Sequence, residues 1–320
     1  MDGWGPSKKG SRYFADRGGE KHSTYLCAMQ LLDGKKAGQA IREEIRLHVA
    51  QRLSEGKKQP HLTAILIGNN GASATYVGAK VKACEEAGIL STLLHYENDL
   101  PEQTLLEKIE SLNNDPDVDG ILVQLPLPKQ IRESAVIHAI DPKKDVDGFH
   151  PINQGLLMQG QPGFIPATPY GIQLLLQHYK IETAGKEAVV IGRSNIVGRP
   201  MSVLLSQPGP VGNCTVTLCH SKTTDLAAHI RRADIVVAAL GQPEFVNADM
   251  IKPGAVVIDV GITRVENPSK KSGFELKGDV DFATVSRLCS WITPVPGGVG
   301  PMTIAALLQN TLLACQQKDI

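Results

Sequence analysis

The stretch Ala188-Val189-Val190-Ile191-Gly192-Arg193-Ser194-Asn195-Ile196-Val197-Gly198-Arg199-Pro200 decides the fold. Its apolar start predicts a buried strand over 188–191, and a helix is expected to begin near Ile196. A loop between a strand and a helix N-terminus offers free backbone N–H groups to a pyrophosphate. The glycines depart from the GxGxxG pattern, because Ser194 replaces the second and the third is displaced to Gly198. Alone, the loop indicates either a dinucleotide phosphate site or an ordinary tight turn.

The segments on both sides of this loop favour the first interpretation. Further strands are predicted over 215–219, 235–239 and 256–260, with helices beginning near Thr223 and Asn247. The first half alternates in the same way, with expected helices over 35–54, 72–87 and 102–112 and expected strands over 62–67, 91–96 and 120–125. We therefore expect an α/β protein of two lobes, the second a doubly wound sheet of the Rossmann type.

The lobe boundaries follow from this alternation. Residues 29–167 are expected to form a catalytic lobe, residues 168–299 a nucleotide-binding lobe, and residues 300–320 a last helix that returns to the first lobe. Its apolar residues include Met302 and Leu313. Residues 1–28 lack the apolar segment of a secretory signal. We expect a disordered or artificially added leader there, with Met29 as the original start and an organelle transit peptide as the alternative.

Composition excludes several classes of partner. Lys plus Arg and Asp plus Glu both total 33, so no net charge recruits nucleic acid or an anionic membrane surface. No apolar run reaches the length of about 20 residues that a membrane span requires. The 6 cysteines form no CxxC pair and the 9 histidines no HExxH spacing, so no metal is expected. Reduced thiols in the cytoplasm and a small-molecule partner are expected.

The strand over 215–219 ends in Cys219-His220-Ser221-Lys222, without an acidic residue. In an NAD site this strand end usually supplies an Asp or Glu to the ribose 2′-hydroxyl. Here Arg193, Ser221 and Lys222 are instead suited to donate hydrogen bonds to a 2′-phosphate. NADP is therefore expected rather than NAD, although a solvated turn lysine is an alternative for Lys222.

Tyr76 and Lys80 stand four residues apart in an expected helix, so their side chains share one face. A lysine that loses hydration beside an aromatic ring can act as an acid or base near neutral pH. The alternatives are a solvated lysine and a packing tyrosine. Short-chain dehydrogenases also use a YxxxK pair, but there the pair follows the nucleotide fold, whereas here it precedes the Gly192 loop by a lobe.

Three further segments point to a cleft between the lobes. Gln124 ends a predicted strand, followed by Leu125-Pro126, and can orient Lys80 without adding charge, unless it only caps backbone. Asp147 lies in Asp145-Val146-Asp147-Gly148, where its carboxylate either accepts two N–H bonds from an aminopyrimidine-like edge or forms an Asx turn. The Gly- and Pro-rich segment 293–303 lets backbone approach a ligand, or serves as a hinge.

Together these motifs resemble the bifunctional methylenetetrahydrofolate dehydrogenase/cyclohydrolase family over about residues 31–316. The resemblance rests on Tyr76-to-Lys80, Gln124-Leu125-Pro126, Asp145-to-Gly148, Gly192-Arg193-Ser194, His220-to-Thr223 and the segment 294–301, all in family order. The large formate-activating domain fused to some members is missing. The resemblance implies a homodimer, a tetrahydrofolate substrate, NADP as cofactor and a place in purine biosynthesis.

The resemblance also implies roles for individual residues. Tyr76 stacks on the pterin-bearing substrate, Asp147 holds the pterin edge, and Lys80, oriented by Gln124, acts at the one-carbon unit. The full expected substrate set is Tyr76, Gln124, Pro126, Asp147, Pro296, Gly297 and Gly298. The expected NADP set is Thr168, Gly192, Arg193, Ser194, Ile196, Ser221, Lys222, Gly261, Ile262 and Gly298.

The implied activity is oxidation of 5,10-methylenetetrahydrofolate to the methenyl form, followed by hydrolysis to 10-formyltetrahydrofolate. Two alternatives stay open. One is a related two-domain dehydrogenase of an amino or hydroxy acid, which has no use for Tyr76, Gln124 and Asp147 together. The other is a dinucleotide-binding protein without turnover, for which retention of Lys80 and of the open glycine loop is not expected.

Overall fold

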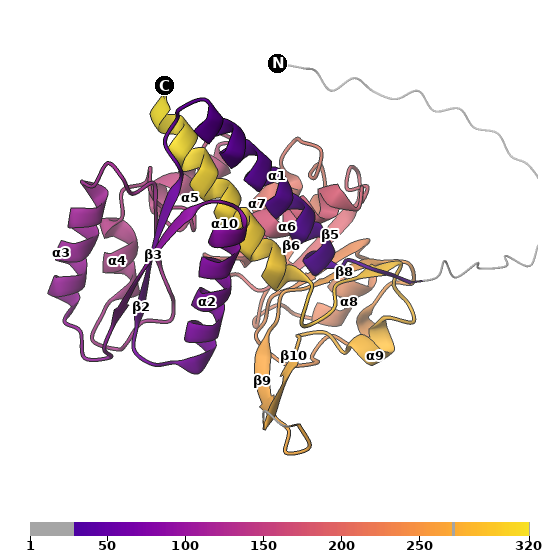
Figure 1. Cartoon of the computed structure of the whole chain (residues 1–320). Helices are drawn as coiled ribbons and strands as arrows, with labels where there is room; N and C mark the ends of the chain where they lie inside the picture. The colour runs from indigo at the N-terminus through magenta and orange to yellow at the C-terminus, as the bar shows by residue number, and fades with distance from the viewer. Residues whose placement is uncertain (1–28, 271–272, 320) are drawn as a thin grey trace, which may run out of the picture.

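The computed structural model describes residues 29–270 and 273–319. Two parallel sheets form two lobes side by side, and helices cover both faces of each sheet (Figure 1). This is the expected α/β architecture. The leader predicted over residues 1–28 lies outside the described residues. Within the described residues, no helix combines the length and the apolar character that a membrane crossing needs.

The first lobe contains a three-stranded sheet in the order β3-β2-β4. Its elements are α1 (Gly34–Ser54), β2 (His61–Ile67), α2 (Gly71–Glu86), β3 (Leu90–Tyr96), α3 (Glu102–Asn113), β4 (Gly120–Val123), α4 (Glu133–Ala139) and α5 (Pro151–Met158). The predicted helices and strands of this half are all present. The strand predicted over 120–125 ends earlier, at Val123, because the chain turns at Leu125-Pro126 and proline has no N–H for the ladder.

Both faces of the central strand β2 of the first sheet are buried. Leu62, Ala64 and Leu66 pack in one apolar cluster with residues of α1, α2 and the last helix α10 (Val299–Gln316). Ile65 and Ile67 pack in the opposite cluster with α3 and α4. Alternate side chains thus enter separate cores, and the strand reads as a continuous apolar run.

The second lobe contains a parallel sheet in the order β1-β11-β8-β7-β5-β6. Its elements are α6 (Ala167–His178), β5 (Glu187–Ile191), α7 (Gly198–Ser206), β6 (Thr215–Cys219), α8 (Leu226–Arg231), β7 (Ile235–Ala238), η1 (Ala248–Met250), β8 (Val256–Asp259), the hairpin β9 (Thr263–Glu266) and β10 (Phe274–Lys277), α9 (Phe282–Val285) and β11 (Trp291–Ile292). The strand order reverses between β5 and β7. Ligands of doubly wound sheets bind at this switch point, beyond the carboxyl ends of the strands.

Several details of this lobe differ from the expectation. The helix expected near Asn247 is the single turn η1, in which the Asn247 side chain accepts the N–H of Asp249 and which Pro253 follows shortly after. The strand β1 (Gln30–Leu31) pairs with β11, although it belongs to the segment assigned to the first lobe. The helices α6 and α9, the antiparallel hairpin β9–β10 and the strand β11 were not predicted. The lobe boundaries themselves stay a prediction.

The last helix α10 returns to the first lobe, as expected, and η2 (Gln317–Asp319) ends the described chain. Figure 1 shows α10 alongside α1, between the two lobes. Its first turn contributes Val299 and Met302 to the core of the second lobe, whereas Leu307 and Leu308 belong to the core of the first. The expected docking residue Leu313 is instead 36% exposed, because it lies on the outer face of the helix.

Candidate active site

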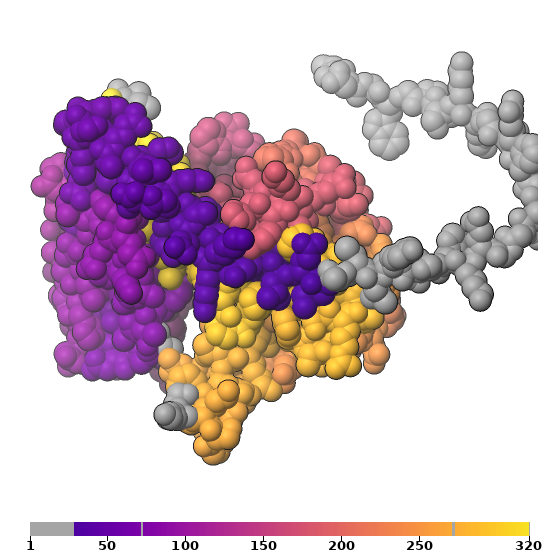
Figure 2. Space-filling view, turned by 45° about the vertical axis from the view of Figure 1, so that its right-hand side comes forward, coloured from indigo at the N-terminus to yellow at the C-terminus, as the bar shows by residue number. Residues whose placement is uncertain are grey.

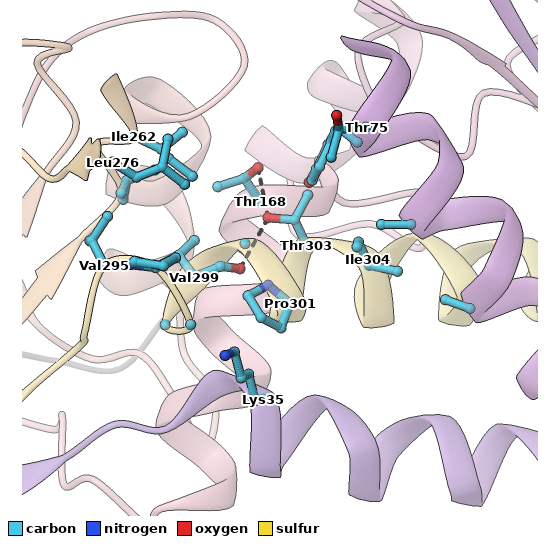
Figure 3. Close-up of a pocket in the computed structure, with 18 of the residues that line it drawn as sticks. Lys35, Thr75, Thr168, Ile262, Leu276, Val295, Val299, Pro301, Thr303 and Ile304 are labelled. Carbon is cyan, nitrogen blue, oxygen red and sulfur yellow. Dashed lines mark hydrogen bonds between the residues drawn. The ribbon is translucent and has the colours of Figure 1, made fainter. Parts of the chain in front are cut away.

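A cavity of about 810 Å³ lies between the carboxyl edges of the two sheets. Figure 2 shows the molecular surface hollowed between the first lobe and the β9–β10 hairpin. Predicted site residues in the cavity wall are Tyr76, Gln124, Pro126, Thr168, Gly261, Ile262, Pro296, Gly297 and Gly298. In Figure 3, Ile262 and Leu276 of the second lobe face Thr75 and Ile304 of the first across this space. Its volume suits a ligand with a cofactor beside it.

Lys80 lies behind this wall, against the two residues that were expected to accompany it. It is 4% exposed, and its Nζ donates to Oε1 of Gln124 at 3.1 Å. The same Nζ lies 4.6 Å from the centre of the Tyr76 ring. Gln124 is itself fixed, because its Nε2 donates to the carbonyl of Leu125 at 2.6 Å. The helical spacing of Tyr76 and Lys80 and the end of β4 therefore bring all three groups together.

The electrostatics of Lys80 favour proton exchange. Burial lowers the pKa of Lys80, and the negative charge of Asp147 opposes this shift. Burial also raises the pKa of Asp147, which Lys80 opposes in turn. No ion pair within 4 Å joins the two among the described residues. A lysine in this environment can lose its proton more easily than one in water.

The turn that holds Asp147 is built by its neighbour Asp145. The buried Asp145 carboxylate accepts hydrogen bonds from the N–H of Phe149, the N–H of His150 and Nδ2 of Asn153. The Asx-type role fits Asp145, whose side chain is fully engaged in the turn. The Asp147 carboxylate accepts no hydrogen bond from the part of the chain that the structure describes. Asp147 does not line the central cavity but lies partly buried behind it, near Lys80.

The Gly- and Pro-rich segment brings the start of α1 to the cavity. Gly297 has a φ of +113°, and its carbonyl accepts the N–H of Lys35 at 3.1 Å. A Cβ on Gly298 would lie 2.6 Å from Cβ of Thr293. The glycines thus serve close packing as well as ligand access. The lining residues Lys35, Leu276 and Thr303 had no predicted role, because only the tertiary fold brings them here.

The loop after β5 has the form of a phosphate cradle. Gly192 has a φ of +117°, and a Cβ there would lie 2.1 Å from the carbonyl oxygen of Ala239. A Cβ on Gly198 would lie 2.0 Å from the carbonyl oxygen of Gly192. The hydroxyl of Ser194 accepts the N–H groups of Val197 and Gly198 and orders the start of α7. The imperfect GxGxxG pattern therefore still forms a tight strand-to-helix turn at the switch point.

The neighbouring strand end carries the residues that were predicted to meet a 2′-phosphate. Because Ile191 pairs with Cys219, the exposed residues Arg193, Ser221 and Lys222 extend from adjacent strand ends. The loop after β6 has no carboxylate up to Thr224. These residues, with Ser194 and Ile196, lie outside the walls of the central cavity, at the carboxyl edge of the second sheet. The cradle and the cationic loop fit NADP.

Asp259 fixes the cofactor side of the cavity. Its carboxylate, 4% exposed, accepts the N–H groups of Gly261 at 2.9 Å, Asp279 at 2.9 Å and Val280 at 3.0 Å. It therefore holds the segment of Gly261 and Ile262, two residues of the predicted NADP set. Within the described ranges, no cluster of three or more His, Cys, Asp or Glu side chains has the arrangement of a metal site.

Two family models match the chain, one on each lobe. The tetrahydrofolate dehydrogenase/cyclohydrolase catalytic domain matches residues 32–147, and the NAD(P)-binding domain of the same family matches residues 166–319. A relative from Flavobacterium johnsoniae, the bifunctional protein FolD, is 60% identical over 291 residues, which cover 91% of this chain and 99% of the relative.

Solved structures agree with the sequence comparison. The FolD methylenetetrahydrofolate dehydrogenase/cyclohydrolase of Campylobacter jejuni is 48% identical with a TM-score of 0.85, covering 91% of this chain and 100% of that one. The Trypanosoma brucei enzyme, complexed with NADP cofactor and inhibitor, is 37% identical with a TM-score of 0.86, covering 91% and 98%. The chain belongs to the tetrahydrofolate dehydrogenase/cyclohydrolase family.

Proposed function

We propose that the chain oxidises 5,10-methylenetetrahydrofolate to 5,10-methenyltetrahydrofolate with NADP and hydrolyses the product to 10-formyltetrahydrofolate. The family and the NADP-complexed relative support both activities. The observation on which the proposal chiefly rests is the buried Lys80, bonded to Gln124 and packed on Tyr76 beside a cavity between the lobes. Both reactions are assigned to this one cavity.

The substrate is assigned to the first lobe. The Tyr76 ring offers a stacking surface to the aromatic part of the folate. The unpaired Asp147 carboxylate suits the N–H donors of the pterin edge. Asp147 lies outside the cavity wall, which Pro126, Pro296, Gly297 and Gly298 form together with Tyr76. This arrangement points the one-carbon unit towards both Lys80 and the second lobe.

The second lobe is assigned the cofactor. When bound, NADP supplies the oxidant that takes up a hydride from the substrate. The residues suited to hold it are Thr168, Gly192, Arg193, Ser194, Ile196, Ser221, Lys222, Gly261, Ile262 and Gly298. The chain contributes to this half mainly by alignment, because the substrate nitrogens stabilise the developing cation.

Hydrolysis needs more from the chain. Water adds to the methenyl carbon and gives up a proton. The bond from this carbon to N5 then breaks, N5 takes the hydroxyl proton, and the formyl group stays on N10. Lys80 is the group placed to exchange that proton, since burial lowers its pKa and Gln124 accepts one of its N–H bonds. The substrate supplies its own electrophile, so the proposed route assigns no step to a metal.

The test is to mix the protein with methylenetetrahydrofolate and NADP and to follow reduced cofactor, methenyl and formyl products by absorbance. Formation of all three species supports the proposal. Turnover of an amino or hydroxy acid instead, or binding of dinucleotide without any folate turnover, contradicts it and favours one of the two alternatives.

The assembly and setting are also proposed. A homodimer is supported by β3, the edge strand of the first sheet, on which Leu90 is 48% and Leu93 is 44% exposed. A cytoplasmic setting is supported by free, buried thiols at Cys84, Cys214 and Cys219. The lobe boundaries at 167/168 and 299/300 are supported by the chain's passage into α6 and α10. A contribution to purine biosynthesis follows only if the formyl product forms.

A further inference from the structure

Asn310 is a buried amide in the middle of the largely apolar helix α10. It is 2% exposed, and its neighbours Leu307, Leu308 and Leu312 belong to the core of the first lobe. Burial of an amide costs free energy unless its hydrogen bonds are made. Asn310 makes them outside its own helix, because Nδ2 donates to the carbonyl of Val146 at 2.8 Å and to that of Ile165 at 3.0 Å.

The two carbonyls belong to segments that meet beside Asp147. Val146 directly precedes Asp147, and Ile165 lies just before α6. The segments also bond each other, since the carbonyl of Asp147 accepts the N–H of Ala167 at 3.2 Å. They pack without spare room, because a Cβ on Gly148 would lie 2.7 Å from the carbonyl carbon of Ile165. The Asn310 amide thus joins α10 to both backbone segments beside Asp147.

We propose that Asn310 is a positioning residue for the folate site, fixing Asp147 opposite Lys80 and Tyr76. The inference rests on the proposed function, in which Asp147 receives the pterin edge. Asn310 does not line the cavity and acts through the backbone on either side of Asp147. About two turns nearer the N-terminus of the same helix, Thr303 lines the cavity, and its hydroxyl donates to that of Thr168 at 3.1 Å (Figure 3).

The next residue provides a matched control. Thr311 is equally buried, at 0% exposure, but its hydroxyl donates at 2.8 Å to the carbonyl of Leu307 within α10. Replacement of Thr311 by valine removes a buried hydrogen bond from the same helix without touching the segments around Asp147. Substitution at either residue is therefore expected to lower helix or core stability. Only substitution of Asn310 is expected to displace Asp147 as well.

The experiment compares Asn310→Leu, Asn310→Ser and Thr311→Val in the full chain. KM for methylenetetrahydrofolate, KM for NADP and kcat are measured in the dehydrogenase direction. We expect both Asn310 variants to raise the folate KM about tenfold or more, with the NADP KM within about twofold, because small displacements of a binding group are costly. Thr311→Val should leave both constants near those of the wild type.

Other outcomes overturn the proposal. If both KM values rise in parallel, or if Asn310→Ser lowers only the melting temperature, Asn310 is merely structural. If Asn310→Leu does not fold, the Asn310→Ser variant decides between the two outcomes. Serine is smaller than asparagine and keeps one hydrogen-bond donor. Wild-type turnover is measured first, and its absence would refute the proposed function itself, a result distinct from an unchanged folate KM in active variants.

Discussion

At the scale of single residues, Lys80 acquires its chemistry from its surroundings. A lysine on the surface of α2 would be hydrated and protonated, whereas burial lowers the pKa of Lys80. Gln124 accepts an N–H bond from it without adding negative charge, so the orientation of the amine is fixed at little cost to deprotonation. The Tyr76 ring closes the other side. These contacts favour the acid/base role over a solvated lysine.

Replacement of Lys80 by methionine tests that role. Lys80→Met should reduce methenyltetrahydrofolate hydrolysis by roughly 10²–10⁴-fold, the usual contribution of a general acid or base. NADP affinity should stay near the wild-type value, because the cofactor residues lie in the other lobe. Hydrolysis is followed by loss of methenyl absorbance, with Lys36→Met, on the exposed start of α1, as control. If Lys80→Met produced the formyl product at the wild-type rate, the acid/base role of Lys80 would be contradicted.

Arg193 is the residue on which cofactor choice is proposed to rest. Arg193→Ala should raise the KM for NADP by roughly 10- to 100-fold, since a hydrogen bond to a charged group contributes about 1.5–3 kcal/mol. The KM for NAD should change little, because NAD has no 2′-phosphate. Arg199→Ala is the matched control, since Arg199 lies on α7 and its Nη1 bonds Asn195 at 2.9 Å. Equal effects of Arg193→Ala on both cofactors would contradict the assignment.

At the scale of elements, hydrophobic patterning predicted most strands of the two sheets but missed the helices α4, α5 and α6 and the two-residue strands. The strands β2 and β6 are apolar runs bounded by turn residues, and β6 coincides with its predicted range. The strands β1 and β11 have two residues each, too few to show a period. Each is held by a neighbouring strand, β1 by β11 and β11 by β8.

The contacts of the candidate site also include some that the sequence predicts and some that it does not. The pairing of Lys80 with Gln124 was predictable, because a helix face and a strand end in one lobe determine it. The cleft contacts of Thr303 and the buried bonds of Asn310 were not, because they join segments more than a hundred residues apart. A local sequence pattern does not predict which backbone carbonyls a distant helix will contact.

Asp259, at the end of β8, should make stability depend on pH. Burial raises the pKa of Asp259 to about 7, against about 3.9 expected in the unfolded chain. The folded state then keeps a proton that the unfolded state has lost, so this stabilising contribution is complete below about pH 4 and is lost as pH rises through about 7. We expect the free energy of unfolding to fall by roughly 2–3 kcal/mol between about pH 5 and pH 8.

Urea unfolding at a series of pH values measures this effect. Asp259→Asn should give a shallower decline over the same range, because the group no longer titrates. The burial that raises the pKa of Asp145 to about 6 adds a decline of the same sign and should persist in that variant. A wild-type stability that rises over this pH range, or an unchanged slope in Asp259→Asn, would contradict the argument.

At the scale of the whole molecule, α10 connects the two lobes. Its first turn packs in the core of the second lobe and its middle in the core of the first. The helix α6 and the strand β1 add further connections, since α6 packs on α10 and β1 leads directly into α1 while pairing in the second sheet. The cavity walls are therefore held by elements that neither lobe possesses alone.

The lobes should consequently unfold together. Leu308→Ala, a truncation in the first-lobe core at 0% exposure, should cost roughly 2–5 kcal/mol. In a Trp4→Phe background, Trp291 of β11 is the one remaining tryptophan and reports on the second lobe. We expect its fluorescence transition and the far-UV circular dichroism transition to shift to lower denaturant by the same amount. Leu313→Ala, at 36% exposure in the same helix, should shift both much less. If Leu308→Ala instead moved only the circular dichroism signal and left the Trp291 transition in place, the two lobes would be independent folding units, and α10 would belong to the first alone.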